Sequence, residues 1–185
     1  MTADEAHSIL TKNCDLDVGK FYGSSSTLTL GSGLIYSNVR HPKFDHSDNL
    51  FSTVEGAAYV LTHECDVDQR NERSFNDYVT ICPLITISAF VVEYDAAFRD
   101  DNQLRGFLTA IAKREVSRVV YIPPKSGDLK FGAFAYLNNL SSTHVSVFAN
   151  ALPVAAVSAY GLREFDQALT NHLLRPKAQR LSFET

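Results

Sequence analysis

The sequence predicts an α+β fold, mainly antiparallel β with helices. Several short strand-like segments are separated by short turns, which is typical of an antiparallel sheet. Three other stretches, 1–14, 86–116 and 159–175, carry apolar residues at helical spacing. The 185 residues, 45% of them apolar, are enough for one well-packed core, so 1–185 is predicted to be a single domain.

The first half of the chain begins with a predicted helix over 1–14. Thr2 and Glu5 form a capping-box pattern, and apolar residues follow at helical spacing up to Leu10. Alternating apolar residues with Gly and Ser between them predict two strands and a bend over 21–39. The His- and Asp-rich segment 41–49 is then predicted to be a polar loop.

The second half continues with two apolar segments, 57–65 and 78–85, which predict the strands of a hairpin. Two amphipathic helices are expected over 86–116, because two runs at helical spacing are separated by the polar sequence RDDN. Further strands are expected from residue 118 onward. The C-terminal helix is expected to end before Pro176, since proline cannot continue a helix.

The densest group of reactive side chains follows the apolar strand and comprises His63, Glu64, Cys65, Asp66 and Asp68. In an extended chain alternate residues share a face, so His63 and Cys65 are expected to be neighbours. Neutral imidazole and thiolate are good zinc ligands, and carboxylates can complete such a site. The sequence therefore indicates a zinc site formed by His63, Cys65, Asp66 and Asp68, with further ligands from the segment 41–48 or from His144.

Two other interpretations of this segment stay open. A Cys at the end of an apolar strand is usually buried packing, and a His there is often only a hydrogen-bonding residue. Alternatively, the imidazole of His63 could activate the thiol of Cys65 as a nucleophile.

Charge and cysteine content limit the classes of partner and compartment. The formal net charge of -4 argues against an extensive DNA-binding surface, because Lys and Arg dominate affinity for phosphate. Any contact with RNA is expected to be local. No stretch approaches 18 consecutive apolar residues, so no membrane span is expected. Cys14, Cys65 and Cys82 are odd in number and widely spaced, and the acidic start has no secretory apolar region, which predicts a cytoplasmic protein.

Four stretches in order carry a resemblance to a known family: GSGLIYS at 31–37, AAYVLTH at 57–63, YVTICPLIT at 78–86 and GAFAYLNNLSSTH at 132–144. The chain resembles the PemK/MazF-like toxins, which are small SH3-like barrels that cut RNA. The resemblance implies an SH3-like antiparallel β-barrel, with the helical pair as an insertion and the N-terminal helix as an addition. It also implies pairing, as a homodimer or as a complex with another protein.

The same resemblance implies candidate catalytic residues. The family cuts RNA with an arginine just before the strand that matches 57–63 and with a Thr or Ser at the end of the strand that matches 78–86. Thr86 matches the second role, but Gly56 occupies the place of the arginine. Arg40 is the candidate replacement, because a guanidinium can stabilise the charge that develops on phosphate. His63 would serve as acid or base, since its ordinary pKa is about 6.5.

Two functions from different classes follow from these observations. The chain is either a binding or interaction module with a His/Cys/Asp site, or a divergent metal-independent endoribonuclease of the toxin-antitoxin or defence type. In the second case Arg40 or Arg70 would neutralise the phosphate. The acidic net charge and the glycine in the arginine's place favour the interaction module.

Overall fold

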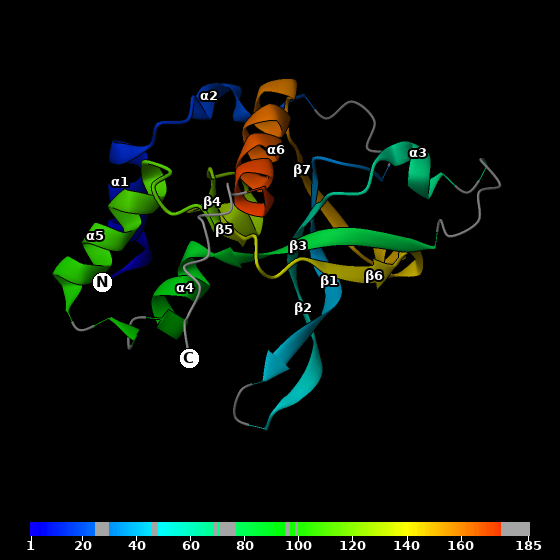
Figure 1. The fold of residues 1–185 in the computed structure, drawn as a ribbon, viewed down its shortest axis with the longest axis horizontal. Coiled ribbons are helices and arrows are strands. Elements are labelled where there is room, and N and C mark those ends of the chain that lie inside the picture. The colour runs from blue at the N-terminus through cyan, green and yellow to red at the C-terminus, as the bar shows by residue number, and fades with distance from the viewer. Residues whose placement is uncertain are drawn as a thin grey trace, which may run out of the picture.

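The computed structural model describes residues 1–24, 30–45, 48–68, 70, 77–94, 97–98 and 100–174. Within them the strands form a seven-stranded antiparallel sheet in the order β4-β5-β3-β2-β1-β7, with β6 paired to β3 (Figure 1). The strands are β1 Leu34–Asp45, β2 Leu50–Val60, β3 Tyr78–Thr86, β4 Val119–Ile122, β5 Ala133–Tyr136, β6 Ser141–His144 and β7 Leu152–Ala156. The predicted α+β class with an antiparallel sheet is confirmed.

The helices are α1 Ala3–Asn13, α2 Val18–Phe21, α3 Glu64–Val67, α4 Ile87–Tyr94, α5 Asp101–Ala112 and α6 Ala159–Leu173, with short 3-10 helices η3 Gly127–Leu129 and η4 Val145–Ala149. The N-terminal helix, the helical pair and the C-terminal helix therefore lie where the sequence predicts them. Thr2 and Glu5 form both hydrogen bonds of the predicted capping box. Among the described residues, no helix is both long and apolar enough to cross a bilayer.

The sheet is not closed into a barrel, which corrects that part of the prediction. β4 and β7 are the two ends of the strand order, and no backbone ladder joins them among the described residues. β3 is instead a shared central strand, which pairs with β6 near Tyr78 and with β5 near Thr86. β3 thus changes partners along its length, from β6 to β5. The predicted pairing of the strands in 57–65 and 78–85 is confirmed, with Tyr59 opposite Cys82.

Apolar side chains form three cores on the two faces of this divided sheet. α6 covers the first core, where the ring of Tyr59 stacks on Phe165 at 4.0 Å between centroids. α1, α4 and α5 cover the second core with side chains such as Leu108, against Phe134 of β5. The third core lies on the opposite face of β2, where Val60 packs, and η4 borders it. β2 thus contributes alternate residues to opposite faces, as a strand buried on both sides must.

β1 and β2 extend beyond the rest of the sheet as a two-stranded arm. The pairing of β1 with β7 ends at Ser37, and the pairing of β2 with β3 ends at Ala58. Beyond these points the two strands pair with each other as far as Asp45 opposite Leu50. We call residues 42–45 and 50–53 the arm, which projects from the lower side of the molecule in Figure 1. The prediction of a polar loop over 41–49 is therefore wrong, because residues 41–45 belong to β1.

Candidate functional site

The reactive segment after β2 does not continue the strand. β2 ends at Val60, and residues 64–67 form the single turn of α3. The Nδ1 atom of His63 accepts a hydrogen bond of 3.2 Å from the backbone N–H of Cys65, so His63 caps this turn. The prediction that His63 and Cys65 share one strand face is therefore wrong. The prediction assumed that the strand continues through residue 65. Instead, the side chain of His63 accepts from the backbone N–H of Cys65, and this local hydrogen bond favours a helical turn over a strand.

Close packing keeps α3 in this position. A Cβ atom added to Gly31 would lie only 2.7 Å from the Cβ of Glu64, so the glycine backbone lies directly against the helix. Only a glycine permits this approach without a shift of one chain. The turn of α3 is thus fixed on one side by Gly31 and at its start by His63.

Asp68 is engaged by Arg70 rather than by His63. The Nε and Nη2 atoms of Arg70 donate to the two carboxylate oxygens of Asp68, both at 3.0 Å, and the backbone N–H of Arg70 donates to Oδ1 at 3.0 Å. These bonds hold the pKa of Asp68 below its ordinary value. Cys65 and Asp66 lie between them on the exposed turn. The side-chain hydrogen bonds of His63 and Asp68 in this segment are therefore made with residues only two positions away.

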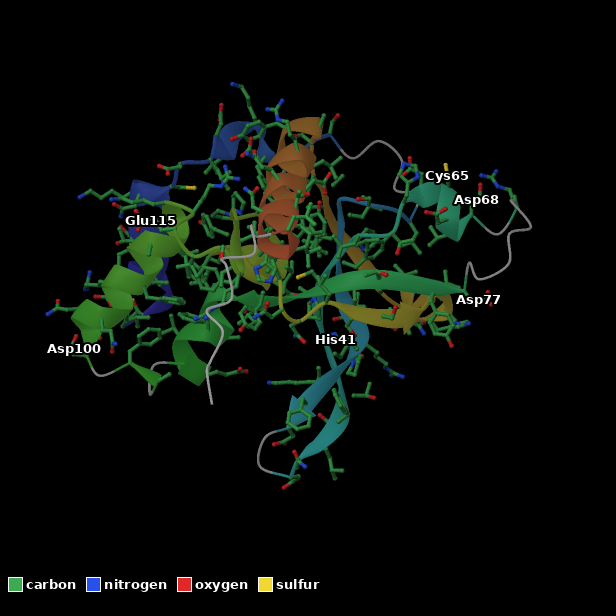
Figure 2. The ribbon with its side chains drawn as sticks, in the orientation of Figure 1. His41, Cys65, Asp68, Asp77, Asp100 and Glu115 are labelled. Carbon is green, nitrogen blue, oxygen red and sulfur yellow. The ribbon has the colours of Figure 1, made fainter. Side chains whose placement is uncertain are left out.

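The expected metal ligands do not gather. Among the described residues, no group of three or more His, Cys, Asp or Glu side chains is placed to hold a metal ion. His41 and Cys65 are well separated in Figure 2, because His41 lies on β1 next to the arm and Cys65 lies on α3. His144 caps η4, where its Nδ1 atom accepts from the backbone N–H of Ser146 at 3.2 Å. His46 lies outside the described residues.

The three candidate catalytic residues also lie apart, and each has a structural contact. Arg40 on β1 donates through Nε to Glu55 at 3.4 Å. Thr86 accepts a hydrogen bond of 3.2 Å from the backbone N–H of Ala89, and so stabilises the start of α4. His63 follows the far end of β2, beyond Val60. Among the described residues, no hydrogen bond or ion pair links Arg40, His63 and Thr86 to one another.

A polar hollow of about 320 Å³ lies beside Arg40 and was not expected from the sequence. It is lined by Asn38, Arg40, Glu55, Ser146, Val147 and Asn150. Asn38 has a φ of 59°, at the bulge where β1 gains a residue relative to β2. Asparagine adopts this left-handed conformation more readily than most residues. The asparagine at position 38 was therefore a weak signal in the sequence for the bulge that borders the hollow. The hollow brings one guanidinium together with amide and hydroxyl groups.

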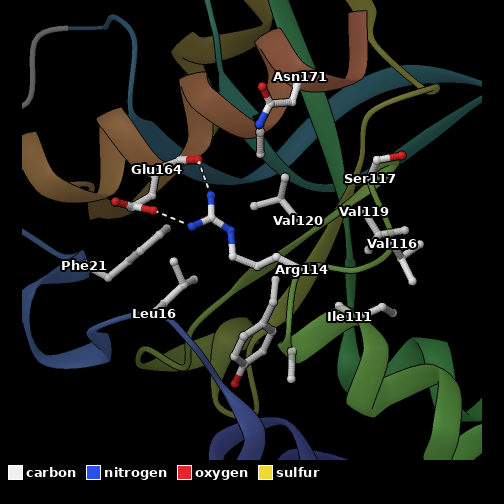
Figure 3. A pocket seen from close by; sticks show the side chains of 13 residues that line it. Leu16, Phe21, Ile111, Arg114, Val116, Ser117, Val119, Val120, Glu164 and Asn171 are labelled. Carbon is white, nitrogen blue, oxygen red and sulfur yellow. Dashed lines mark hydrogen bonds and ion pairs between the residues drawn. The ribbon is translucent and has the colours of Figure 1, made fainter. Parts of the chain in front are cut away.

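A second cavity, of about 110 Å³, lies between α6 and the turn after α5 (Figure 3). Its walls are mainly apolar, with Phe21 and Val120 among them. Arg114 donates through Nη1 to the carboxylate of Glu164 at 2.6 Å, and Glu164 is only 14% exposed. The two charges neutralise each other, so this cavity has the character of a packed junction between α6 and the body.

A third cavity is apolar and lies between α4, α5 and the strands β4 and β5. Its volume is about 270 Å³, and we call it the aromatic cavity because its walls include Phe90, Phe98, Phe107, Phe134 and Tyr136. Phe90 and Phe134 are buried, whereas Phe98 and Phe107 are half-buried. Arg118 and Ala97 also line the cavity, and both are exposed. In the sequence these aromatic residues are indistinguishable from ordinary core positions.

The arm also exposes large apolar side chains. Leu50 and Phe51 are 65% and 74% exposed, and the ring of Phe51 meets that of Phe44 edge-on at 5.2 Å between centroids.

A search of known protein-family models and of curated proteins found no match to the chain.

Proposed function

We propose that this chain is a protein-interaction module and that the arm is its contact surface. The observation that carries the proposal is the exposure of Leu50 and Phe51, 65% and 74%, at the end of a hairpin that extends beyond the sheet. Large apolar side chains grouped in this way commonly mark a surface that binds another protein. A two-stranded hairpin has little stability of its own, so contact with a partner would also stabilise the arm.

The placement of the candidate catalytic residues supports this proposal over RNA cleavage. Arg40 faces Glu55, which offsets its charge, and Thr86 and His63 each cap a helix. General acid–base chemistry requires groups within hydrogen-bond reach of the same substrate atoms. Arg40 lies in the middle of β1, Thr86 is the last residue of β3, and His63 lies beyond the end of β2.

We also propose a relationship to the PemK/MazF-like proteins and a cytoplasmic location. Four sequence stretches in the family's order support the relationship, together with the antiparallel set β6-β3-β2-β1, of which β1, β2 and β3 contribute side chains to the third core. The hydroxyl of Thr143 on β6 donates to the main-chain carbonyl of Arg40 on β1, which brings these two strands of the set together. The three widely spaced cysteines support the location.

The alternative function is the endoribonuclease, and the polar hollow beside Arg40 is the observation in its favour. Arg40 is 71% exposed and lies among hydrogen-bonding groups of Asn38, Ser146 and Asn150. A guanidinium in such a setting could hold a phosphate. Cleavage would then require that a substrate phosphate displace Glu55 from Arg40.

Two measurements test the proposal against this alternative. Purified protein is incubated with a mixed RNA pool, with and without chelator, as wild type, Arg40→Ala and the matched control Arg163→Ala, which removes another exposed arginine. We expect no cleavage that depends on Arg40. Cleavage that Arg40→Ala abolishes and Arg163→Ala retains would establish the nuclease and overturn the proposal.

The second measurement concerns the arm itself. Chains associated with the protein, identical or different, are quantified by mass spectrometry for wild type, Phe51→Ser and Leu152→Ser. Leu152 is a matched control because it is an apolar residue, 58% exposed, on β7. We expect that Phe51→Ser removes a specific association and that Leu152→Ser retains it. Equal association in all three proteins would contradict the role of the arm.

A further inference from the structure

We infer that the partner of the arm is a second copy of this chain, and that the tip of each arm docks in the aromatic cavity of the other copy. The inference deepens the proposed function and depends on it, because it takes the arm as the contact surface. Three features of one chain carry it: an apolar tip, an apolar cavity that can receive it, and charges of opposite sign beside the two.

The apolar tip of the arm consists of Phe44, Leu50 and Phe51. Phe44 and Phe51 lie on neighbouring strands, and their rings pack edge to face at 5.2 Å. Lys43 opposite Ser52 continues the ladder toward the body. The tip therefore presents Leu50 and Phe51 side by side at the end of two paired strands.

The aromatic cavity has the size and chemistry to receive one of these side chains. An apolar cavity of about 150 Å³ can hold a benzene molecule, so a cavity of about 270 Å³ can admit a phenylalanine ring. Phe90 and Phe134 are buried and meet edge-on at 5.0 Å, while Phe98 and Phe107 pack at 5.3 Å and remain half-buried. An entering ring would find aromatic neighbours at the distances at which such rings attract.

Charge beside the two features is complementary. Asp45 and Asp48 flank the tip of the arm, and both are exposed. Arg118, also exposed, lines the aromatic cavity. Opposite charges at the rim of an apolar contact favour one partner and one orientation over others. A partner with a basic tip would be repelled at the same cavity.

The position of the arm makes the contact reciprocal. The Nζ atom of Lys43, in the arm, lies 3.8 Å from a carboxylate oxygen of Glu93. Glu93 is on α4, one helical turn after Phe90. The arm thus leaves the body beside the helix that forms one wall of the cavity, and Figure 1 shows both on the same side of the molecule. Two copies related by a two-fold axis at this side can exchange arms, so that each contact occurs twice in one closed interface.

The first test measures the molar mass of untagged protein by light scattering over a range of concentrations. We expect a dimer, which Phe51→Ser in the arm and Ala97→Arg in the cavity each weaken on the order of tenfold or more, because central apolar contacts dominate interface affinity. Leu152→Ser serves as the control and retains the dimer. Circular dichroism of each variant confirms that it is folded.

Charge reversal makes the test specific for the pairing. Arg118→Glu is expected to weaken the dimer, and addition of Asp48→Arg to the same chain is expected to restore it, since the signs are then exchanged. Loss of the dimer in Arg118→Glu without recovery in the double variant would overturn the proposed orientation.

Disulfide cross-linking tests directly whether position 51 of one copy lies next to position 97 of the other. In a Cys65→Ser background, a tagged chain with Phe51→Cys is mixed with an untagged chain with Ala97→Cys under mild oxidation. An interchain disulfide between these positions, and none between Phe51→Cys and Leu152→Cys, is the expected result. A monomer at all concentrations, or a dimer that Phe51→Ser leaves intact, would overturn the inference. A monomer whose arm still binds a different protein would overturn it and leave the proposed function in place.

Discussion

The hydroxyl of Thr143 donates a hydrogen bond of 3.0 Å to the main-chain carbonyl of Arg40 and so joins β6 to β1. No ladder is formed between these strands among the described residues. Thr143 is buried, and the carbonyl would otherwise have no strand partner on that side. A single side chain therefore links β6 to β1, two strands that are joined through β3 and β2 in the sheet.

Replacement of Thr143 by Val is expected to destabilise the protein by about 1–2 kcal/mol. Valine has the same shape, so the loss reflects the hydrogen bond and the unsatisfied carbonyl left at Arg40. Urea unfolding of both proteins measures the difference. Thr53→Val on the arm is the control, because Thr53 is exposed and its replacement should change stability little. Equal effects at the two positions would contradict the role of the bond.

The longer helices α1, α4, α5 and α6 could be predicted from the sequence because each has one buried face. In α5 the buried residues Leu104, Leu108 and Ile111 recur at helical spacing, and Asp100 caps the first turn. α1 carries its capping box in the sequence itself. Burial on one face leaves a periodic pattern, and that pattern was sufficient to locate these elements.

The arm could not be predicted, for the opposite reason. Residues 42–45 and 50–53 are exposed or half-buried on both faces, so no alternation of apolar and polar residues marks them as strands. The predicted placement of His63 and Cys65 on one strand face was wrong for a different reason. A one-turn helix such as α3 has too few residues for a period, and its start depends on the hydrogen bond that His63 accepts.

The stability of the protein is expected to fall in acid partly because of His41. This residue is buried on β1, and loss of hydration lowers the pKa of its imidazole below the ordinary value of 6.5. The unfolded chain therefore binds the proton more readily than the folded one. Stability from this group is fully present above pH 6.5 and decreases as pH falls below it, by up to about 1.4 kcal/mol per pH unit.

Urea unfolding of wild type and His41→Phe across this interval measures the effect. The variant keeps an apolar ring at the position but cannot titrate, so its stability should fall less steeply with decreasing pH. Parallel profiles for the two proteins would show that His41 does not contribute. The slope decides the question, because the substitution also changes packing at every pH.

The contact between Arg114 and Glu164 combines an ion pair with an unfavourable backbone conformation. Arg114 has a φ of 62°, in the left-handed region that favours glycine. Arg114→Ala and Arg114→Gly both remove the ion pair, but only glycine relieves the backbone. We expect Arg114→Gly to be more stable than Arg114→Ala by about 0.5–1 kcal/mol.

A double-mutant cycle isolates the ion pair. Arg114→Gly, Glu164→Gln and the double variant are expected to give a coupling of about 1 kcal/mol, because Arg114 is partly exposed to solvent. Arg163→Ala is the control, since Arg163 lies 3.9 Å from the same carboxylate and is 70% exposed. A coupling near zero would assign the contact no role in holding α6 to the body.

The last prediction concerns His63, whose Nδ1 atom accepts from the backbone of Cys65. Asparagine is a good N-cap residue, so His63→Asn is expected to preserve α3, whereas His63→Ala removes the acceptor and should cost about 0.5–2 kcal/mol locally. Amide hydrogen exchange over residues 64–67 measures this effect, with faster exchange expected only in His63→Ala. Elemental analysis separates capping from metal binding, because asparagine can replace histidine as a cap far better than as a zinc ligand. Stoichiometric zinc in untagged wild type, lost in both His63→Asn and Cys65→Ser, would contradict the assignment of His63 to capping alone.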